Sequence, residues 1–150
     1  MTDLHMPTLR QARGADWDTI RTLLSDSGLP VADLEPSRLD GFLVAEDGDR
    51  LVGLIGLEIL DTVGLLRSLV VEPSVRSAGL GGKLVGALEA AAQVAGLTEL
   101  WLLTIDAEQF FERHGFEIVS RKAAPDNIRA TDEFGNLCPE TAFLMHKPIR

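Results

Sequence analysis

The sequence predicts an α+β fold in one domain, with helices packed on a mixed β-sheet. Three observations support this prediction. The chain has 150 residues, of which 45% are hydrophobic and 25% are charged, the balance of a soluble globular domain with one core. Its early part alternates short apolar runs with turns, as antiparallel strands do. Its middle places a long helical segment between two apolar strands, which indicates one right-handed parallel crossover.

The N-terminal half is expected to combine strands with one or two helices. Asp16 precedes an apolar pattern of helical period and is expected to cap that helix. Two apolar runs flank an Asp-Gly turn at residues 47–49, which predicts a β-hairpin. The predicted elements are a strand at residues 8–11, a helix at 17–27, a shorter helix within 31–39, and strands at 41–46 and 51–60.

The C-terminal half contains the predicted crossover. Its long helix, residues 79–96, has an apolar stripe for which we expect Leu84, Leu88, Ala91 and Ala95. The other predicted elements are strands at 65–71, 100–103, 116–120 and 142–146, with turns at 61–64 and a helix at 107–114 closed by Gly115. The stretch 121–141 is long for a loop in a compact domain, which favours a functional role or a short helix of its own.

Composition excludes several classes of function. The net charge of −9 argues against nucleic-acid binding, which depends on a basic surface. The longest apolar run, residues 51–60, is interrupted by Glu58 and is too short to span a bilayer, and the N-terminus does not have the pattern of a signal peptide. The single cysteine, Cys138, cannot form an internal disulfide, so we expect a cytoplasmic protein.

A glycine-rich segment after the strand at residues 65–71 is the strongest sign of a binding site. Residues 67–83 contain three basic side chains and one acid, although residues 1–50 have a net charge of −5. The first turn of a helix has unpaired N–H groups, and glycines let a phosphate approach them closely. The segment reads Arg76-Ser77-Ala78-Gly79-Leu80-Gly81-Gly82-Lys83, which predicts a site for an anion.

Other interpretations of this segment remain open from the residues alone. A P-loop would need Ser or Thr after Lys83, where Leu84 stands, and glycine in place of Ser77. A dinucleotide fingerprint would need glycine at Leu84. A plain helix start with a glycine-rich entrance is the simplest alternative.

Two motifs in order resemble the GNAT superfamily of acetyltransferases. Arg76, Gly79 and Gly81 fit its pyrophosphate motif, Arg/Gln-x-x-Gly-x-Gly/Ala, directly after a strand like the family's central strand. Residues 107–116 resemble its second signature, Ala-x-x-Phe-Tyr-x-x-x-Gly-Phe. The resemblance extends from the first predicted strand to the last.

The resemblance implies a GNAT-type sheet whose two central parallel strands splay apart around the pantetheine arm of acetyl-CoA. It places the N–H of Val71 near the thioester oxygen, as a catalytic hydrogen-bond donor. No metal is expected, because the three histidines have no ligand spacing. The implied cofactor-binding residues are Leu69, Val70, Val71, Arg76, Ser77, Ala78, Gly79, Leu80, Gly81, Gly82, Lys83, Thr104 and Phe111.

Glu58 is the candidate general base. Acetyl transfer needs a neutral amine, and deprotonating an α-amine of pKa roughly 8 at pH 7 costs only ~1.4 kcal/mol, so one carboxylate suffices. Glu58 interrupts an apolar strand beside the predicted central strand. The alternative is an outward-facing residue on an alternating strand.

Two positions depart from the family pattern. Phe111 stands where the family usually has the tyrosine that protonates the departing thiolate, and the chain contains no tyrosine. Thr104 stands where many members have an asparagine that contacts the cofactor. We therefore expect direct attack of the amine on the thioester, with a proton relayed by solvent.

The acceptor is expected to be a small amino-acid-like amine. An arginine fork suits its carboxylate, and the candidates are Arg67 and Arg129, with Ser68 and Thr131 as hydrogen-bond partners. Each arginine could instead be a surface or ion-paired residue. The C-terminal third is similar to bacterial ArsN-type N-acetyltransferases associated with arsenic resistance, on Arg121, Pro125, residues 128–131, 133–134 and 137–139. That similarity implies a glutamate-like acceptor, including arsenic-containing analogues.

Two rival functions remain at this stage. The missing tyrosine suits a catalytically silent module that binds acyl-CoA, and a groove shaped by residues 121–141 would suit a peptide acceptor. GNAT proteins often form homodimers, and the late strands are the expected pairing surface. Cys138 is expected to be a buried packing residue. It is not expected to chelate arsenic, because the chain has no second thiol.

Overall fold

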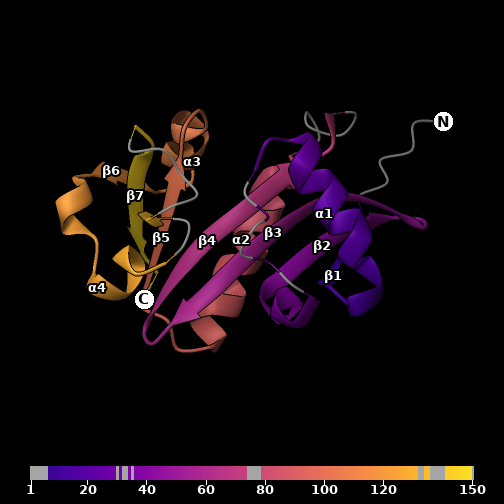
Figure 1. The fold of residues 1–150 in the computed structure, drawn as a ribbon, viewed down its shortest axis with the longest axis horizontal. Coiled ribbons are helices and arrows are strands. Elements are labelled where there is room, and N and C mark those ends of the chain that lie inside the picture. Colours follow the sequence, from indigo (N-terminus) through magenta and orange to yellow (C-terminus); the bar gives the residue numbers. More distant parts are fainter. Residues whose placement is uncertain are drawn as a thin grey trace.

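The protein is built on one seven-stranded sheet, shown in the computed structural model in Figure 1. The structure describes residues 7–29, 31, 34, 36–73, 79–131, 134–135 and 141–149. The strand order is β1-β2-β3-β4-β5-β7-β6, and β4 with β5 form its parallel pair. The strands are β1 (Thr8–Gln11), β2 (Phe42–Asp47), β3 (Arg50–Leu60), β4 (Val63–Val71), β5 (Glu99–Thr104), β6 (Glu117–Val119) and β7 (Phe143–Pro148). The helices are α1 (Trp17–Asp26), α2 (Leu80–Val94), α3 (Glu108–Arg113) and α4 (Asp126–Arg129), with 3₁₀ turns η1 (Gly14–Asp16), η2 (Pro36–Gly41) and η4 (Arg121–Ala123).

The predicted α+β architecture is confirmed, including an early antiparallel part and a parallel crossover through α2. Of the shorter helix predicted within residues 31–39, the described residues 31 and 34 are not helical, and residues 36–39 belong to η2, a 3₁₀ turn that runs directly into β2. Residues 30, 32, 33 and 35 lie outside the described part of the chain.

The capping role predicted for Asp16 is wrong in detail. Asp16 occupies the N-cap position of α1, but its carboxylate does not cap that helix. It accepts the N–H of Arg13 at 2.7 Å and two hydrogen bonds from the guanidinium of Arg10 at 2.9 and 3.0 Å. The bonds from Arg10 and from the N–H of Arg13 lower the pKa of Asp16 below its usual value, and Arg10 also donates to Glu46 at 3.1 Å. The carboxylate therefore ties β1 and β2 to the start of α1.

The β3–β4 hairpin is tighter than the predicted turn at residues 61–64. Leu60 pairs with Val63, so the turn consists of Asp61 and Thr62 alone. Asp61 has a positive φ of 62°, a conformation that aspartate tolerates better than most residues. This conformation lets β4 begin two residues earlier than the apolar run predicted.

The apolar stripe predicted on α2 is correct at Leu84 and Leu88 and wrong at its C-terminal end. Ala91 and Ala95 are exposed, while Ala92 is fully buried. The buried residues are Leu80, Leu84, Val85, Leu88 and Ala92. The buried face thus continues in steps of four residues, because α2 lies along the strands beneath it for its whole length.

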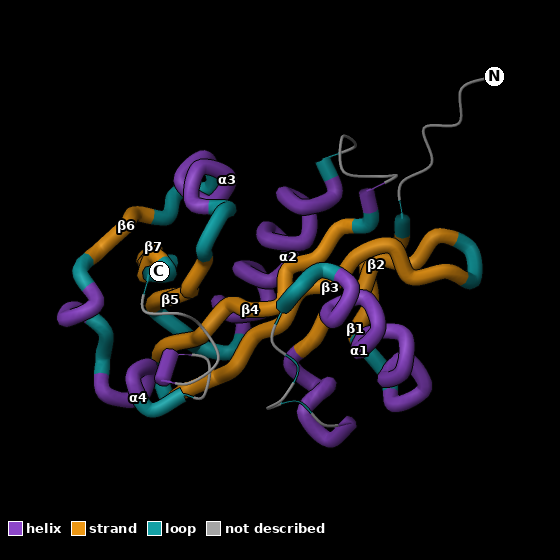
Figure 2. Tube along the Cα trace, turned by 45° about the horizontal axis from the view of Figure 1, so that its top comes forward, coloured by secondary structure: helices purple, strands orange, loops and turns teal. Residues whose placement is uncertain are grey.

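Helices cover both faces of the sheet, as Figure 2 shows. On one face, α2 and α3 enclose a core that includes Leu66, Leu84 and Phe116. On the opposite face, α1 covers the β1–β3 end, and α4 covers the end formed by β5 and β7, where Ile128, Trp101 and Leu144 belong to one buried cluster. Between these two covered areas lies the middle of β3 and β4. No helix of the described residues is long and apolar enough to cross a membrane.

The parallel strands β4 and β5 pair over only three positions, the last being Leu65 with Trp101. β4 then continues to Val71 and β5 to Thr104 without pairing to each other, and Figure 1 shows the two strands diverging. The predicted splayed pair is therefore present in the fold.

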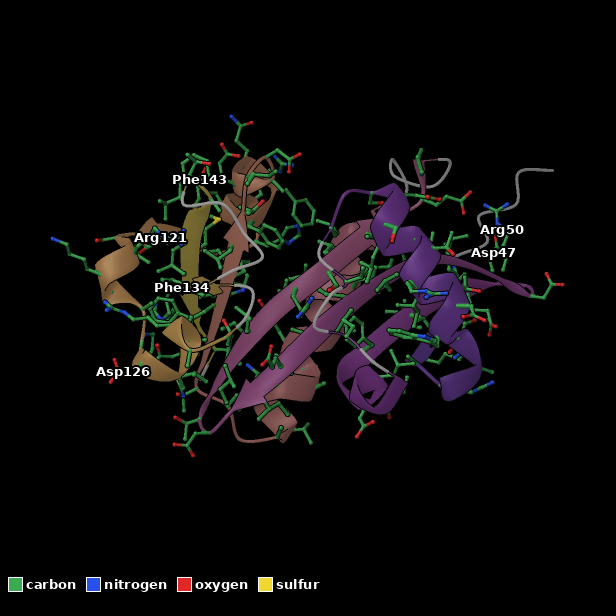
Figure 3. All side chains as sticks on the ribbon, in the orientation of Figure 1. Asp47, Arg50, Arg121, Asp126, Phe134 and Phe143 are labelled. Atoms are coloured by element: carbon green, nitrogen blue, oxygen red, sulfur yellow. The ribbon has the colours of Figure 1, made fainter. Side chains whose placement is uncertain are left out.

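The segment after β6 is folded back on the sheet rather than irregular throughout. Its described part contains η4 and α4. The guanidinium of Arg121 lies 4.6 Å above the ring of Phe134 and donates to the carbonyl of Ala142 at 3.1 Å. Figure 3 shows Arg121 and Phe134 together on the α4 side of the molecule. These contacts fasten the segment to the start of β7.

Candidate active site

Beyond Leu65, β4 no longer pairs with β5, and one edge of β4 faces the gap between the two strands. The N–H of Glu72 donates to the carbonyl of Val52 at 2.8 Å, so Glu72 points toward β3. Because successive residues of a strand alternate, the N–H and C=O of Val71 and Leu69 point the opposite way, toward the gap. Main-chain groups at this edge can bind an extended ligand as an additional strand would bind.

The first turn of α2 lies at the end of this gap and is suited to an anion. Gly79, its N-cap residue, has a φ of 77°, which a side chain would strain. Its first turn contains no acid, and no side chain caps it among the described residues. The N–H groups of this turn carry partial positive charge, and the exposed ammonium of Lys83 adds a full positive charge. Arg76, Ser77 and Ala78, which were assigned to the same site, lie outside the described residues.

Two aromatic side chains, Phe110 of α3 and His114 directly after it, pack against this first turn, a contact that the sequence did not predict. A Cβ on Gly81 would lie 3.2 Å from the ring of Phe110 and 3.8 Å from Cγ2 of Val71. A Cβ on Gly82 would lie 2.9 Å from Cε1 of His114. Glycine at these two positions thus lets α2 approach α3 and β4 closely. No local pattern in the sequence marks Phe110 as a neighbour of α2.

The two positions that depart from the family pattern are both accounted for. The hydroxyl of Thr104 accepts the N–H of Ala107 at 3.0 Å and so shapes the turn into α3. Phe111 is only 5% exposed and packs edge-on against Phe116, with ring centroids 5.6 Å apart. Phe111 therefore contributes to the core between α3 and β6, and its assignment to the cofactor stays a prediction.

A pocket of about 320 Å³ opens on the face of the sheet that carries α1 and α4. It contains both Glu58 from β3 and Arg67 from β4. Glu58 pairs with Leu65 and Arg67 with Gly56, so the two side chains are diagonal neighbours on one face, roughly 7–8 Å apart at their Cα atoms. Its lining residues are Leu34, Asp40, Gly41, Phe42, Leu57, Glu58, Ile59 and Arg67.

A bulge in β4 shapes this part of the pocket. Leu54 pairs with Val70 and Gly56 with Arg67, so β4 has one residue more than β3 over this stretch. Ser68 takes up the extra residue with a φ of 62°. Its hydroxyl accepts Nε–H of the buried Arg67 at 3.0 Å, which fixes the guanidinium at the floor of the pocket. Ser68 is thus a positioning residue for Arg67.

Arg129 and Thr131 do not line this pocket. Arg129 donates to the carbonyls of Ala124 and Lys122 at 3.1 and 2.7 Å, and closes the turn between η4 and α4. The Thr131 hydroxyl donates to the carbonyl of Ile128 at 2.7 Å. The structure therefore brings together Glu58, Arg67 and Ser68 and leaves the other two in the α4 segment.

Several pocket residues were missed by sequence reasoning, among them Leu34, Asp40 and Ile59. Leu34 and Asp40 come from the stretch before β2, which has no motif. The described residues contain no group of three side chains that could hold a metal ion.

Comparison with known proteins assigns the family. Residues 38–118 match the acetyltransferase (GNAT) domain. An amino-acid acetyltransferase of Mycobacterium tuberculosis is 31% identical over 120 residues, which cover 73% of this chain and 68% of that relative. The chain belongs to the GNAT acetyltransferase family. The GNAT domain predicted from the two motifs is therefore confirmed.

One further relative matches over part of its length, and two solved structures share the fold. The N-acetyltransferase YjcF of Bacillus subtilis is 36% identical over 81 residues, 53% of this chain and 58% of YjcF. N-acetylglutamate synthase from Neisseria gonorrhoeae, solved with coenzyme A and N-acetyl-glutamate, superposes with a TM-score of 0.84 at 19% identity over 99% of this chain and 36% of its own. Rv2747 from Mycobacterium tuberculosis, solved with CoA and NLQ, has a TM-score of 0.80 at 24% identity over 96% and 100% of the two chains. These solved structures share the GNAT fold with this chain.

Proposed function

We propose that this GNAT protein transfers an acetyl group from acetyl-CoA to the amine of a small amino-acid-like molecule. One observation carries the proposal. The pocket with Glu58 and Arg67 adjoins the stretch of β4 whose main chain faces the β4–β5 gap. An acceptor in the pocket and a thioester in the gap would meet at the bulge around Ser68. The names of the relatives, an amino-acid acetyltransferase and an N-acetylglutamate synthase, are consistent with this acceptor class.

The residues present fit coenzyme A. Gly79 leaves open space at the first turn of α2 for a pyrophosphate, and the N–H groups of Gly81 and Gly82 belong to the same turn. The stretch of β4 that does not pair with β5 suits the amide-containing pantetheine arm. Arg76, Ser77, Ala78 and Lys83 would add charge and hydrogen bonds around the same phosphates. Leu69 and Val70 would border the arm.

The proposed chemistry is direct attack of the amine on the thioester. Glu58 takes a proton from the acceptor ammonium, directly or through one water molecule. The amine nitrogen then forms a bond to the acetyl carbon, while the N–H of Val71 stabilises the charge that develops on the thioester oxygen. The C–S bond breaks, the nitrogen loses its second proton to solvent as the amide forms, and coenzyme A leaves as a thiolate, which takes its proton from solvent. The free thiol has a pKa of roughly 8.5, so no tyrosine is required for this departure.

Acetyl-CoA-dependent thiol release is the decisive assay. The acceptor panel contains free amino acids, glutamate and its arsenic-containing analogues, polyamines and short peptides. Release that depends on one amino-acid-like acceptor, with the acetylated amine identified by mass spectrometry, would establish the function. Preference for an arsenic-containing analogue would support the ArsN-type assignment. Preference for peptides would contradict the small-molecule proposal.

Single variants of the two candidate arginines separate their roles. Arg67→Ala removes the cation at the floor of the pocket, so the acceptor KM should rise at least ~10-fold while the acetyl-CoA KM stays the same. Arg129→Ala is the matched control, since its guanidinium bonds only to carbonyls of its own segment in the contacts described above. A larger rise in KM for Arg129→Ala than for Arg67→Ala would transfer the carboxylate-binding role to Arg129.

A silent acyl-CoA-binding module is the second candidate, and one observation favours it. Phe111 is buried and has no proton to donate where the family usually has tyrosine. Tight acetyl-CoA binding without thiol release for any acceptor would select this alternative. A homodimer also stays a proposal, with the edge strand β6 as its pairing surface and sedimentation as its test.

A further inference from the structure

Asp40 lies at the rim of the acceptor pocket and is held there by its neighbours. Its carbonyl accepts the side-chain amide of Gln11 at 2.9 Å. The preceding Leu39 is buried in the core beneath α1. The following Gly41 touches β3 so closely that a Cβ there would overlap the carbonyl oxygen of Leu57, the residue next to Glu58. The backbone of Asp40 is thus fixed relative to the candidate base.

The described lining of the pocket carries one positive and two negative side chains. Arg67 is 4% exposed at the floor, Glu58 is half-buried, and Asp40 is exposed at the rim. An α-amino acid would place its carboxylate at Arg67 and its ammonium at Glu58. In that pose, Asp40 is the remaining charged side chain of the described lining.

The rest of the lining is apolar. Leu34, Phe42, Leu57 and Ile59 line the same pocket, and Ile59 is 54% exposed beside Glu58. Such walls suit an aliphatic stem between the α-carbon and the end of a side chain. A carboxylate at the end of that stem would lie in the field of Asp40, whereas an amide or an ammonium would not be repelled.

We propose that Asp40 is a specificity-determining residue that excludes acceptors with an acidic side chain, so that the enzyme selects amino acids whose side chain is uncharged or cationic. This inference rests on the proposed function, because it assumes that the acceptor occupies this pocket. It narrows the proposed acceptors from glutamate-like compounds in general to those whose side chain carries no negative charge. Glutamine and ornithine fit this description, and glutamate does not.

The test compares glutamate, glutamine and ornithine, because the first two are nearly identical in shape. Each amino acid is titrated calorimetrically into the protein saturated with CoA, where no transfer can occur. Thiol release from acetyl-CoA is measured in parallel. We expect glutamine and ornithine to bind at least ~10-fold more tightly than glutamate, with the same order in kcat/KM. The preference should shrink at high salt, because the rim is exposed.

The variant Asp40→Asn should reduce the preference for glutamine over glutamate by about 10-fold. Asp26→Asn is the matched control, since it removes the same charge from the exposed end of α1, outside the pocket lining, and should leave the ratio unchanged. An equal change of this preference in both variants would show that it depends only on the net charge of the protein, and would overturn the inference.

Failure of the inference and failure of the proposed function give different results. Binding of glutamate as tight as that of glutamine, or a ratio that Asp40→Asn does not change, overturns the role of Asp40 even if the enzyme is active. Ordered binding to the CoA complex without thiol release supports the role of Asp40 and contradicts the enzyme. If none of the three amino acids binds, the inference is overturned whatever the outcome of the wider panel.

Discussion

At the scale of single residues, the candidate site depends on a few side chains whose neighbours decide their use. Glu58 is a candidate base from the sequence, and the structure adds that Arg67 is its diagonal neighbour in the same pocket. Arg129 has the same chemistry as Arg67 but uses it to bind carbonyls of its own segment. The residue type alone therefore does not distinguish a ligand from a structural contact.

Replacing Glu58 tests the proposed base. Glu58→Gln keeps the shape of the side chain and removes its ability to take a proton, so kcat/KM for the acceptor should fall about 100- to 10,000-fold. The acetyl-CoA KM should not change. The measurement is thiol release over a range of pH, with Glu117→Gln on the edge strand β6 as the matched control. Full turnover of Glu58→Gln at every pH would refute the assignment.

Asp16 gives a prediction about pH and stability. Because Arg10 and the N–H of Arg13 lower its pKa in the folded protein, the ionised carboxylate stabilises the fold above its unfolded pKa of about 3.9. This stabilisation is lost as the pH falls through the lowered pKa. Asp16→Asn should therefore reduce the free energy of unfolding by ~2 kcal/mol at pH 7, and the difference from wild type should shrink below about pH 4.

Urea unfolding of both proteins at pH 7 and at pH 3 measures this difference. Asp18→Asn is the control, because Asp18 is 88% exposed and its pair with Arg21 lies on the surface. Equal stability of wild type and Asp16→Asn at pH 7 would show that the Arg10–Asp16 pair contributes nothing net.

At the scale of elements, the junction between η2 and β2 sets the pocket through its contact with β3. A Cβ at Gly41 would overlap the carbonyl oxygen of Leu57, so the two segments can approach only because residue 41 is glycine. The periodicity of η2 does not reveal this contact. The same applies to α3, whose Phe110 lies against the first turn of α2.

Two glycine substitutions separate close packing from intrinsic helix propensity. Gly41→Ala should reduce the free energy of unfolding by ~1–3 kcal/mol and weaken acceptor binding, because β2 or β3 must shift. Gly86→Ala, in exposed mid-helix of α2 with no atom within 4 Å of its added Cβ, should raise stability by about 0.5–1 kcal/mol. Urea unfolding measures both changes. A gain in stability for Gly41→Ala would contradict the contact.

At the scale of the whole molecule, the gap between β4 and β5 joins the two proposed binding sites. The gap exists because the strands pair only from Val63 to Leu65 and then diverge, with α2 and α3 on one face and the pocket on the other. This arrangement would let acetyl-CoA and the acceptor meet at the edge of β4, so that neither ligand would have to pass through the hydrophobic core.

Binding of acetyl-CoA should be visible in amide exchange. We expect slower hydrogen exchange at Leu69, Val71 and the first turn of α2, and no change at the β3–β4 turn. At a ligand concentration 100 times Kd, linkage should raise the free energy of unfolding by ~2.7 kcal/mol. Protection confined to β6 or β7, or an unchanged melting temperature, would place the cofactor elsewhere or exclude it.

Much of the fold could be predicted because local patterns determine it. The strands β1–β3, the hairpins and the long helix α2 follow from periodicity and turn residues. Their observed boundaries differ by a few residues from the predicted ones where the backbone conformation of a turn residue sets the boundary, as at Asp61. The burial of Ala92 rather than Ala91 depends on how α2 lies on the sheet, which periodicity alone specifies only approximately.

The sequence by itself determined the family and the glycine-rich turn, because both depend on residues close together in the chain. Backbone freedom at Gly79 and small size at Gly81 are properties of those residues wherever they occur. The tertiary structure alone decided the pocket proposed for the acceptor, since Asp40, Glu58 and Arg67 come from η2, β3 and β4. Strand register and a one-residue bulge placed their side chains on one face, and register follows from the packing of the whole sheet.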